Sequence, residues 1–233
     1  MKKHIDKRYV KNMNALSIGE NKILNESKVC IVGCGGLGGY IIELLGRIGV
    51  GNLTVIDGDV FDETNLNRQV LCHTKNIGQN KAIEAKKRME LVNPLIKVTA
   101  IDKMLTAKNA STILKGHDVI VDALDNIKVR LLLQEKAKQL DIPMIHGAIA
   151  GFYGQVTTIL PGDDILNKLY PEDTIEKKGI EGSLGNLSFI VPLIASMEVS
   201  EVIKLLIKQG DLLNKKVLFI DSLENNYDLI EFD

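Results

Sequence analysis

Four glycines lie close together near the start of the chain, within residues 28–38. An apolar run precedes them and a helical pattern follows at once, which indicates a strand, a glycine turn and a helix N-terminus. Such a turn cradles phosphate groups, because backbone N–H groups and the positive end of the helix dipole face the ligand. We expect Gly33 to allow the tight turn and Gly38 to let the helix pack closely on the strand. Between them, Gly35 and Gly36 would let phosphates approach the backbone.

Acidic and basic residues follow the turn at spacings that suit a nucleoside triphosphate. Asp57 ends the second apolar run, at about the distance from the glycines where an acidic residue meets a ribose. Arg68 offers a rigid fork of donors that matches phosphate oxygens, and Asn65 could add a neutral donor. Lys81 opens a predicted helix, where a cation is unfavourable unless an anion binds beside it. Each residue also has an alternative without a ligand. Asp57 could simply be an acidic residue at a strand end, Arg68 a solvated arginine at a capped helix start, and Lys81 an exposed surface lysine.

A second acidic group lies further along, in the segment from Asp122 to Asn126. This segment follows the fourth apolar run, at the edge where open α/β sheets bind their ligands. One carboxylate there can hold Mg²⁺, which prefers few protein ligands together with phosphate oxygens. We assign that role to Asp125. Ordinary turn chemistry at a strand end is the alternative for both aspartates.

The elements that must position these residues alternate along the chain. Continuous apolar runs separated by amphipathic stretches are typical of a parallel sheet covered on both faces. The pattern therefore predicts an α/β fold, a Rossmann-like, largely parallel doubly wound sheet. The predicted strands are 29–33, 53–57, 97–101, 119–123 and 143–147, and the predicted helices are 37–48, 81–91, 107–114 and 128–140.

The pattern changes in the last third of the chain. Residues 154–160 alternate and extend the sheet, and a helix is predicted over 192–208. Two closing antiparallel strands are predicted at 216–220 and 227–232. The stretch 161–188 is charged and glycine-rich without periodicity, which indicates a long surface crossover loop. We interpret 1–233 as a single domain with an N-terminal arm at 1–25.

Composition narrows the class of protein. The 233 residues are 45% hydrophobic and 25% charged, which is ordinary for a globular chain that buries a sizeable core. A net charge of −1 argues against non-specific binding of nucleic acid and against a basic membrane-surface protein. The N-terminus shows no signal peptide, and three cysteines give no disulfide framework. We expect a cytoplasmic location.

Six short motifs occur in the order seen in the ThiF/MoeB/HesA group, the prokaryotic branch of the ubiquitin-activating enzyme superfamily, and the chain resembles that group over nearly its whole length. The motifs are the glycine turn, the Asp57 strand end, Thr-Asn-Leu-Asn-Arg-Gln at 64–69, Gly-Gln-Asn-Lys at 78–81, Asp-Ala-Leu-Asp-Asn at 122–126 and His-Gly-Ala at 146–148.

The resemblance implies an adenylyltransferase that uses ATP and Mg²⁺. Such enzymes activate the C-terminal glycine of a ubiquitin-like sulfur carrier protein of the ThiS/MoaD type, in thiamin or molybdopterin synthesis, and release pyrophosphate. It implies a homodimer and a carrier that ends in Gly-Gly. By position, Gly36 and Asp57 would hold the nucleotide, and Asn65, Arg68 and Lys81 its phosphates. Asp125 would bind Mg²⁺, with Asn126 beside it.

The chain departs from the group at two places. An Arg-Tyr-x-Arg segment often stands near the start, and its last arginine reaches the ATP site of the partner subunit. Lys11 stands at that position here, which keeps the charge but loses the bidentate fork. An exposed tail residue is the equal alternative. The zinc-binding Cys-x-x-Cys pairs are also missing, because Ile165 and Lys168 occupy the first pair's positions, so we expect no zinc.

Three other functions remain open at this point, and the near-neutral charge gives little support to one of them, an ATP-dependent tRNA-base dehydratase of the same group, because RNA binding usually needs a basic face. An NAD(P)-binding oxidoreductase would use the same glycine turn, but it has no need of a phosphate-directed Arg68 together with a metal-directed Asp125. A non-catalytic family member that only binds a carrier would fit the missing cysteines and Lys11. The intact phosphate-directed residues oppose that reading.

Overall fold

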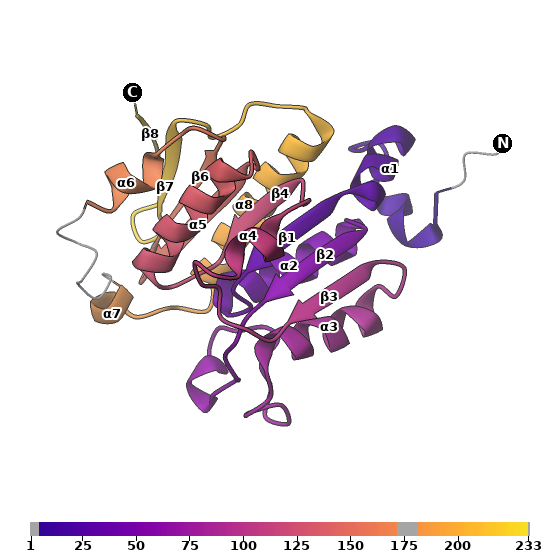
Figure 1. Ribbon diagram of the computed structural model, residues 1–233, viewed down its shortest axis with the longest axis horizontal. Coiled ribbons are helices and arrows are strands. Elements are labelled where there is room, and N and C mark those ends of the chain that lie inside the picture. The colour runs from indigo at the N-terminus through magenta and orange to yellow at the C-terminus, as the bar shows by residue number, and fades with distance from the viewer. Residues whose placement is uncertain (1–4, 172–180, 233) are drawn as a thin grey trace.

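The computed structural model describes residues 5–171 and 181–232, and over these residues it contains one eight-stranded sheet (Figure 1). The strand order is β3-β2-β1-β4-β5-β6-β7-β8. Strands β3 to β5 in this order are parallel, whereas β6, β7 and β8 are each antiparallel to the strand before them. The bounds are β1 (Lys28–Val32), β2 (Asn52–Ile56), β3 (Lys97–Ile101), β4 (Val119–Asp122), β5 (Met144–Ala150), β6 (Tyr153–Ile159), β7 (Lys216–Asp221) and β8 (Asn226–Glu231).

Helices cover both faces of this sheet, because side chains alternate along its strands. Ile31 of β1 packs into one apolar cluster, while its neighbours Cys30 and Val32 pack into another. The first cluster defines the α8 face, which is covered by α2 (Gly36–Ile48), α3 (Lys81–Val92) and α8 (Ile190–Ile207). The second defines the α5 face, which is covered by α4 (Ala110–Leu114), α5 (Ile127–Gln139) and α6 (Ile165–Leu169).

This architecture confirms the predicted fold class, a largely parallel α/β sheet with antiparallel strands at its C-terminal end. Most predicted elements begin and end within one or two residues of the observed ones. The helix predicted over 107–114 is shorter, because the Asn109 side chain accepts a hydrogen bond from the Thr106 N–H and donates one to the Met104 carbonyl. These bonds hold the chain in a turn, so α4 begins only at Ala110.

The predicted crossover loop contains helical structure, which corrects that interpretation. α6 buries Ile165 and Leu166 against the α5 face, and the Leu166 N–H donates to the Gln134 carboxamide of α5. A second short helix, α7 (Glu181–Leu184), follows. Helices of four or five residues are too short to produce a visible periodicity. Residues 172–180 of the predicted loop lie outside the described residues.

The predicted N-terminal arm is folded against the body of the protein. It contains η1 (Lys7–Asn12) and α1 (Ile18–Glu26), and the latter starts with a capping box between Ser17 and Glu20. Tyr9 is buried, and its hydroxyl accepts a 2.8 Å hydrogen bond from the Asn93 amide. In the described part of the chain, no helix combines the length and apolar character needed to cross a membrane.

Candidate active site

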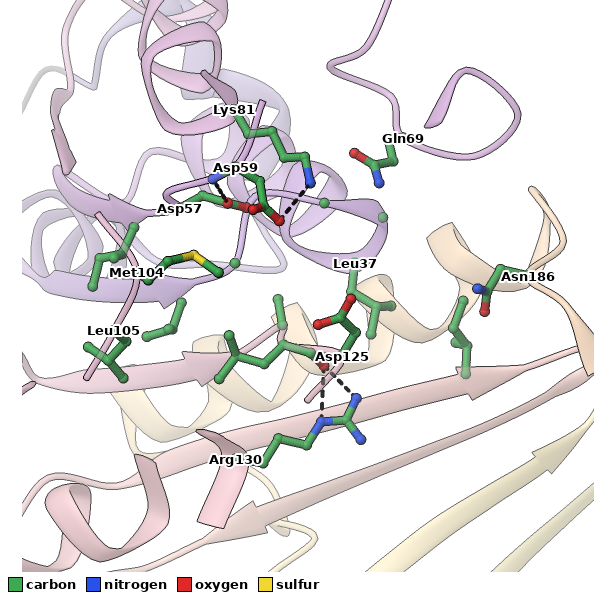
Figure 2. A pocket seen from close by; sticks show the side chains of 18 of the residues that line it. Leu37, Asp57, Asp59, Gln69, Lys81, Met104, Leu105, Asp125, Arg130 and Asn186 are labelled. Carbon is green, nitrogen blue, oxygen red and sulfur yellow. Dashed lines mark hydrogen bonds and ion pairs between the residues drawn. The ribbon is translucent and has the colours of Figure 1, made fainter. Parts of the chain in front are cut away.

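A cleft of about 280 Å³ opens at the carboxyl ends of the parallel strands. It lies where the strand order reverses, since β1 pairs with β2 on one side and with β4 on the other. Ligands of open α/β sheets bind at such a switch point. The glycine turn after β1, the ends of β2 and β4, and the segment before α8 all contribute to its lining (Figure 2).

The glycine turn forms the floor of this cleft. Gly33 adopts a φ of +100°, and a Cβ there would lie 2.4 Å from the Ala123 carbonyl oxygen, so the position requires glycine. Gly35 and Gly36 line the cleft, and a Cβ at either would meet no described atom closer than 3.5 Å. A Cβ would make ordinary contact with Gln69 at the first position and with Val191 at the second, so the surroundings do not force glycine at these two positions, which lie at the N-terminus of α2.

Asp57 follows β2 and faces the same cleft. Its carboxylate accepts hydrogen bonds from the Cys34 N–H at 2.8 Å and from the Asp59 N–H at 2.9 Å. Burial raises the pKa of Asp57, and the two backbone hydrogen bonds and nearby Lys81 oppose that rise. Each carboxylate oxygen keeps a further lone pair, which is the acceptor that a ribose hydroxyl would need.

Arg68 and Lys81 also line the cleft. The Arg68 guanidinium donates to the Thr64 carbonyl and to the Asn67 side chain, and it has no carboxylate partner among the described residues. Lys81 is buried at the start of α3, with its Nζ 3.4 Å from the exposed carboxylate of Asp59. Asp59 is therefore the anion that offsets a cation at this helix N-terminus.

Asp125 lies on the opposite side of the opening from Lys81, as Figure 2 shows. Its exposed carboxylate makes no hydrogen bond or ion pair with any other described residue. A free carboxylate near a phosphate-sized space suits Mg²⁺, which takes few protein ligands and completes its shell with phosphate oxygens and water. Within 5–171 and 181–232, no group of three or more His, Cys, Asp or Glu side chains could hold a metal ion by itself.

Four predicted site residues, Gly38, Asn65, Asn126 and Lys11, do not line the cleft. Gly38 is a packing position, because a Cβ there would lie 1.9 Å from the Gly33 carbonyl oxygen. Asn65 accepts the Asp62 N–H through its Oδ1 in a capping box, which leaves its Nδ2 for other partners. Asn126 caps α5 by accepting the Val129 N–H.

Lys11 lies far from the cleft of its own chain. Its segment, η1, is held to the C-terminal ends of α2 and α3: Asn12 donates to the Ile48 carbonyl, and Arg8 donates to the Asn93 side chain. Those helix ends lie at the amino edge of the parallel strands, opposite the cleft. Lys11 itself is exposed there.

Five polar residues that line the cleft were not predicted from the sequence, namely Asp59, Gln69, Lys103, Arg130 and Asn186. Gln69 follows Arg68 directly, and its Oε1 is buried without a hydrogen-bond partner among the described residues. Asn186 arrives from the segment before α8 and accepts a hydrogen bond from Asn67 through its carbonyl. Adjacency to Arg68 was a usable signal for Gln69, whereas no local pattern marks Asn186.

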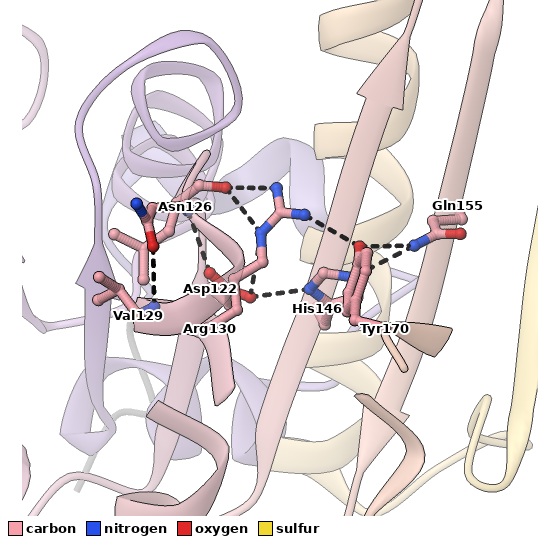
Figure 3. Close-up of polar contacts among 8 residues, drawn as sticks. Asp122, Asn126, Val129, Arg130, His146, Gln155 and Tyr170 are labelled. Carbon is pink, nitrogen blue, oxygen red and sulfur yellow. Dashed lines mark hydrogen bonds and ion pairs between the residues drawn. The ribbon is translucent and has the colours of Figure 1, made fainter. Parts of the chain in front are cut away.

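A polar network lies below the cleft on the α5 face (Figure 3). Asp122 is fully buried at the end of β4, and its Oδ2 lies 2.8 Å from Nδ1 of buried His146. Arg130 approaches the same oxygen at 3.9 Å. Burial lowers the pKa of His146, although Asp122 opposes that effect, so the imidazole is neutral near pH 7.

The fold and the cleft define a nucleotide-binding α/β protein, and comparison with known proteins gives the family. The ThiF family model matches residues 9–232, so this chain belongs to the ThiF family. It is 34% identical over 218 residues to the SAMP-activating enzyme E1 of Haloferax volcanii, which covers 92% of this chain and 79% of that protein. It is also 35% identical over 214 residues to the sulfur carrier protein adenylyltransferase of Thermus thermophilus. That match covers 88% of this chain and 78% of the relative.

Solved structures confirm the fold. The crystal structure of Escherichia coli MccB with AMPCPP and MccA matches with a TM-score of 0.83 at 21% identity, and the match covers 99% of this chain and 72% of that one. Family, fold and named relatives agree with the resemblance that the sequence motifs indicated. As a member of an adenylyltransferase family, the protein is an ATP-using enzyme.

Proposed function

We propose that this protein is an ATP- and Mg²⁺-dependent adenylyltransferase that activates the C-terminal glycine of a ubiquitin-like sulfur carrier protein and releases pyrophosphate. One observation carries the proposal: the Arg68 guanidinium, the Lys81 ammonium and the Asp125 carboxylate, which has no partner among the described residues, line one cleft above the glycine turn. A dinucleotide oxidoreductase has no use for that set, and no observation favours it.

In the proposed reaction, a carrier carboxylate oxygen attacks the α-phosphorus of ATP. The bond from that phosphorus to the bridging oxygen breaks, pyrophosphate leaves with the electron pair, and an acyl adenylate remains. Arg68 and Lys81 would face the phosphates and stabilise the negative charge that grows on the departing group. The glycine turn and Asp57 would hold the nucleotide so that the attack is aligned.

The donor set of the cleft fits Mg²⁺. Asp125 would hold the ion, with Asn126 beside it, and bound Mg²⁺ would neutralise phosphate charge and assist the departure of pyrophosphate. Asn65 would offer its free Nδ2 to a phosphate. The chain would need no protein nucleophile for this step.

The names of two relatives, a sulfur carrier protein adenylyltransferase and a SAMP-activating enzyme E1, support a carrier protein as the acceptor of AMP. We extend this to a carrier ending in Gly-Gly, and to a homodimer in which Lys11 reaches the cleft of the second copy. The position of Lys11 at the edge opposite its own cleft supports that arrangement. The whole chain would act as one adenylation domain in the cytoplasm.

Carrier-dependent ATP–pyrophosphate exchange tests the proposal, with purified protein and candidate carriers ending in Gly-Gly. Arg68→Ala should slow exchange by roughly 10²- to 10³-fold, the usual loss for one electrostatic donor. Arg47→Ala is the matched control, because Arg47 pairs with Glu43 at the far end of α2 and should exchange normally. Equal exchange rates in the two variants would contradict the assignment of Arg68.

A further inference from the structure

Arg130 holds the backbone next to the proposed metal-binding carboxylate. Its Nε and Nη2 both donate to the Leu124 carbonyl, at 3.0 and 2.5 Å. Leu124 immediately precedes Asp125, so this fork fixes the peptide group from which the Asp125 side chain leaves the sheet. Arg130 is itself only 7% exposed, which means that its position is set by neighbours rather than by water.

Tyr170, at the end of α6, contacts the remaining part of the Arg130 guanidinium. Arg130 Nη1 donates to the Tyr170 hydroxyl at 2.9 Å, and the guanidinium carbon lies 5.6 Å from the centre of the tyrosine ring. The same hydroxyl accepts from Gln155 Nε2 at 3.0 Å and lies 3.2 Å from His146 Nε2 (Figure 3).

The hydrogen-bonding capacities in this network match one another. Neutral His146 donates its Nδ1–H to Asp122, so its Nε2 is an acceptor for the Tyr170 O–H. The two lone pairs of that hydroxyl then serve Arg130 and Gln155. Phenylalanine at position 170 would keep the ring but remove the oxygen that Arg130, Gln155 and His146 share, although Gln155 Nε2 would still lie 3.4 Å from His146 Nε2.

We propose that Tyr170 and Arg130 are positioning residues that hold the turn from Leu124 to Asp125 in the orientation that binds the metal of a metal–ATP complex. Through Tyr170, the docking of α6 on the α5 face is coupled to the geometry of the cleft. The inference rests on the proposed function for the identity of the ligand. It assigns a task to two residues that lie on different segments, one on α5 and one at the end of α6.

Asp125 explains why the turn matters. Its carboxylate has no hydrogen bond or ion pair with another described residue, so the backbone turn is the part of its position that neighbouring residues fix. A more mobile peptide group at Leu124 would let the Asp125 carboxylate adopt more orientations. Binding of Mg²⁺ would then have to order the carboxylate, which lowers the affinity for the ion. Nucleotide binding without metal depends on the glycine turn and Asp57 and would be spared.

The test compares Tyr170→Phe with the unchanged protein in titrations of Mg²⁺ against a fixed concentration of α,β-methylene ATP, with calorimetry or thermal shift as the readout. We expect the Mg²⁺ concentration for half-saturation to rise roughly 3- to 10-fold, the effect of losing about one hydrogen bond. Affinity for the analogue in EDTA should not change. Tyr227→Phe, on exposed β8, is the matched control and should match the unchanged protein.

Arg130→Lys supplies a second variant. Lysine keeps the positive charge but cannot donate two hydrogen bonds from one planar group to the Leu124 carbonyl. It should raise the Mg²⁺ requirement at least as much, and adding Tyr170→Phe should raise it little further. An unchanged Mg²⁺ requirement in both folded variants, or an equal loss of affinity with and without Mg²⁺, would overturn the inference. Metal-dependent binding of the analogue without pyrophosphate exchange on any carrier would contradict the proposed function alone, and the Mg²⁺ shift would still support positioning.

Discussion

The two faces of the sheet treat buried acids in opposite ways. On the α5 face, the Asp122 carboxylate accepts hydrogen bonds from the Leu124 N–H at 3.1 Å and from His146 at 2.8 Å. On the α8 face, Glu198 is equally buried, yet neither of its carboxyl oxygens has a hydrogen-bond partner among the described residues. The acid that is paired lies below the cleft, and the acid that is not paired lies in an apolar layer.

The carboxyl group of Glu198 fits against β5 only because residue 147 is a glycine. A Cβ at Gly147 would lie 2.3 Å from the Glu198 Cδ, so the carboxyl group presses directly on the backbone of β5. Burial, with a smaller contribution from Asp122, raises the pKa of Glu198 well above its ordinary value. The comparison teaches that burial of an acid does not by itself bring hydrogen-bond partners: Asp122 has them, and Glu198 has none among the described residues.

Helix α8 itself shows that the difference is local. Glu201 lies three residues after Glu198 and is also buried, but its Oε2 accepts bonds from the Thr158 hydroxyl at 2.5 Å and the Leu213 N–H at 2.8 Å. Lys204 forms an ion pair with its other oxygen. Glu198 and Glu201 therefore allow the effect of hydrogen-bond partners on stability to be compared for two buried glutamates in one helix.

Asp122→Ala should cause the largest loss of stability, about 3 to 5 kcal/mol, because it leaves Arg130 and His146 buried without their shared acid. Urea denaturation of the variant and of the unchanged protein measures it. Asp228→Ala on exposed β8 is the control and should change the free energy of unfolding by less than about 0.5 kcal/mol. A loss of similar size in both variants would remove the contrast between paired and exposed acids.

Glu201→Gln should cost about 1 to 3 kcal/mol, because the amide group cannot serve Lys204 while its remaining oxygen serves two donors. The same denaturation experiment measures it, near pH 7. Stability equal to that of the unchanged protein would mean that the hydrogen bonds of Glu201 contribute nothing, and the contrast between the two glutamates would lose its meaning.

Glu198→Gln should act in the opposite direction and depend on pH. Since the folded pKa is raised above the unfolded value near 4.5, the contribution of the protonated acid to stability is complete below about pH 4.5 and is lost as the pH rises toward the folded pKa. Glutamine does not titrate, so the variant should be more stable by about 1 to 2 kcal/mol at pH 8. Near pH 4.5 it should equal the unchanged protein.

Unfolding curves between pH 4.5 and 8 would check this expectation, with Glu90→Gln on exposed α3 as a control that should leave the pH dependence unchanged. A Glu198→Gln variant with the same pH dependence as the unchanged protein would show that Glu198 is ionised in the folded state and has a partner after all.

The parallel sheet, and the edge of it that carries the cleft, could be predicted from the sequence because long apolar runs and a glycine turn are local signals. The sequence analysis also named Arg68, Lys81 and Asp125, which the structure brings to one cleft. It could not separate a ligand-binding asparagine from a capping one, since both uses need the same carboxamide; Asn126 proved to cap α5.

Residues whose task depends on distant partners escaped prediction. Arg130 matters because of a backbone carbonyl on the preceding turn, and Tyr170 because α6 docks beside it. α6 has only five residues, too few for its apolar side to show a period. The unpaired burial of Glu198 could not be predicted either. Its sequence position shows a glutamate in an apolar helix, but the absence of partners depends on residues from other elements.

The pairing of β1 with β4 bears on how the newly made chain acquires its cleft. Val29 pairs with Val119, so β2, β3 and their helices form a long loop that must close before the two strand ends meet. Closing long loops costs entropy and slows folding. Gly33 and Ala123 therefore come together late, and a chain leaving the ribosome gains affinity for nucleotide only after its middle third has been synthesised and docked.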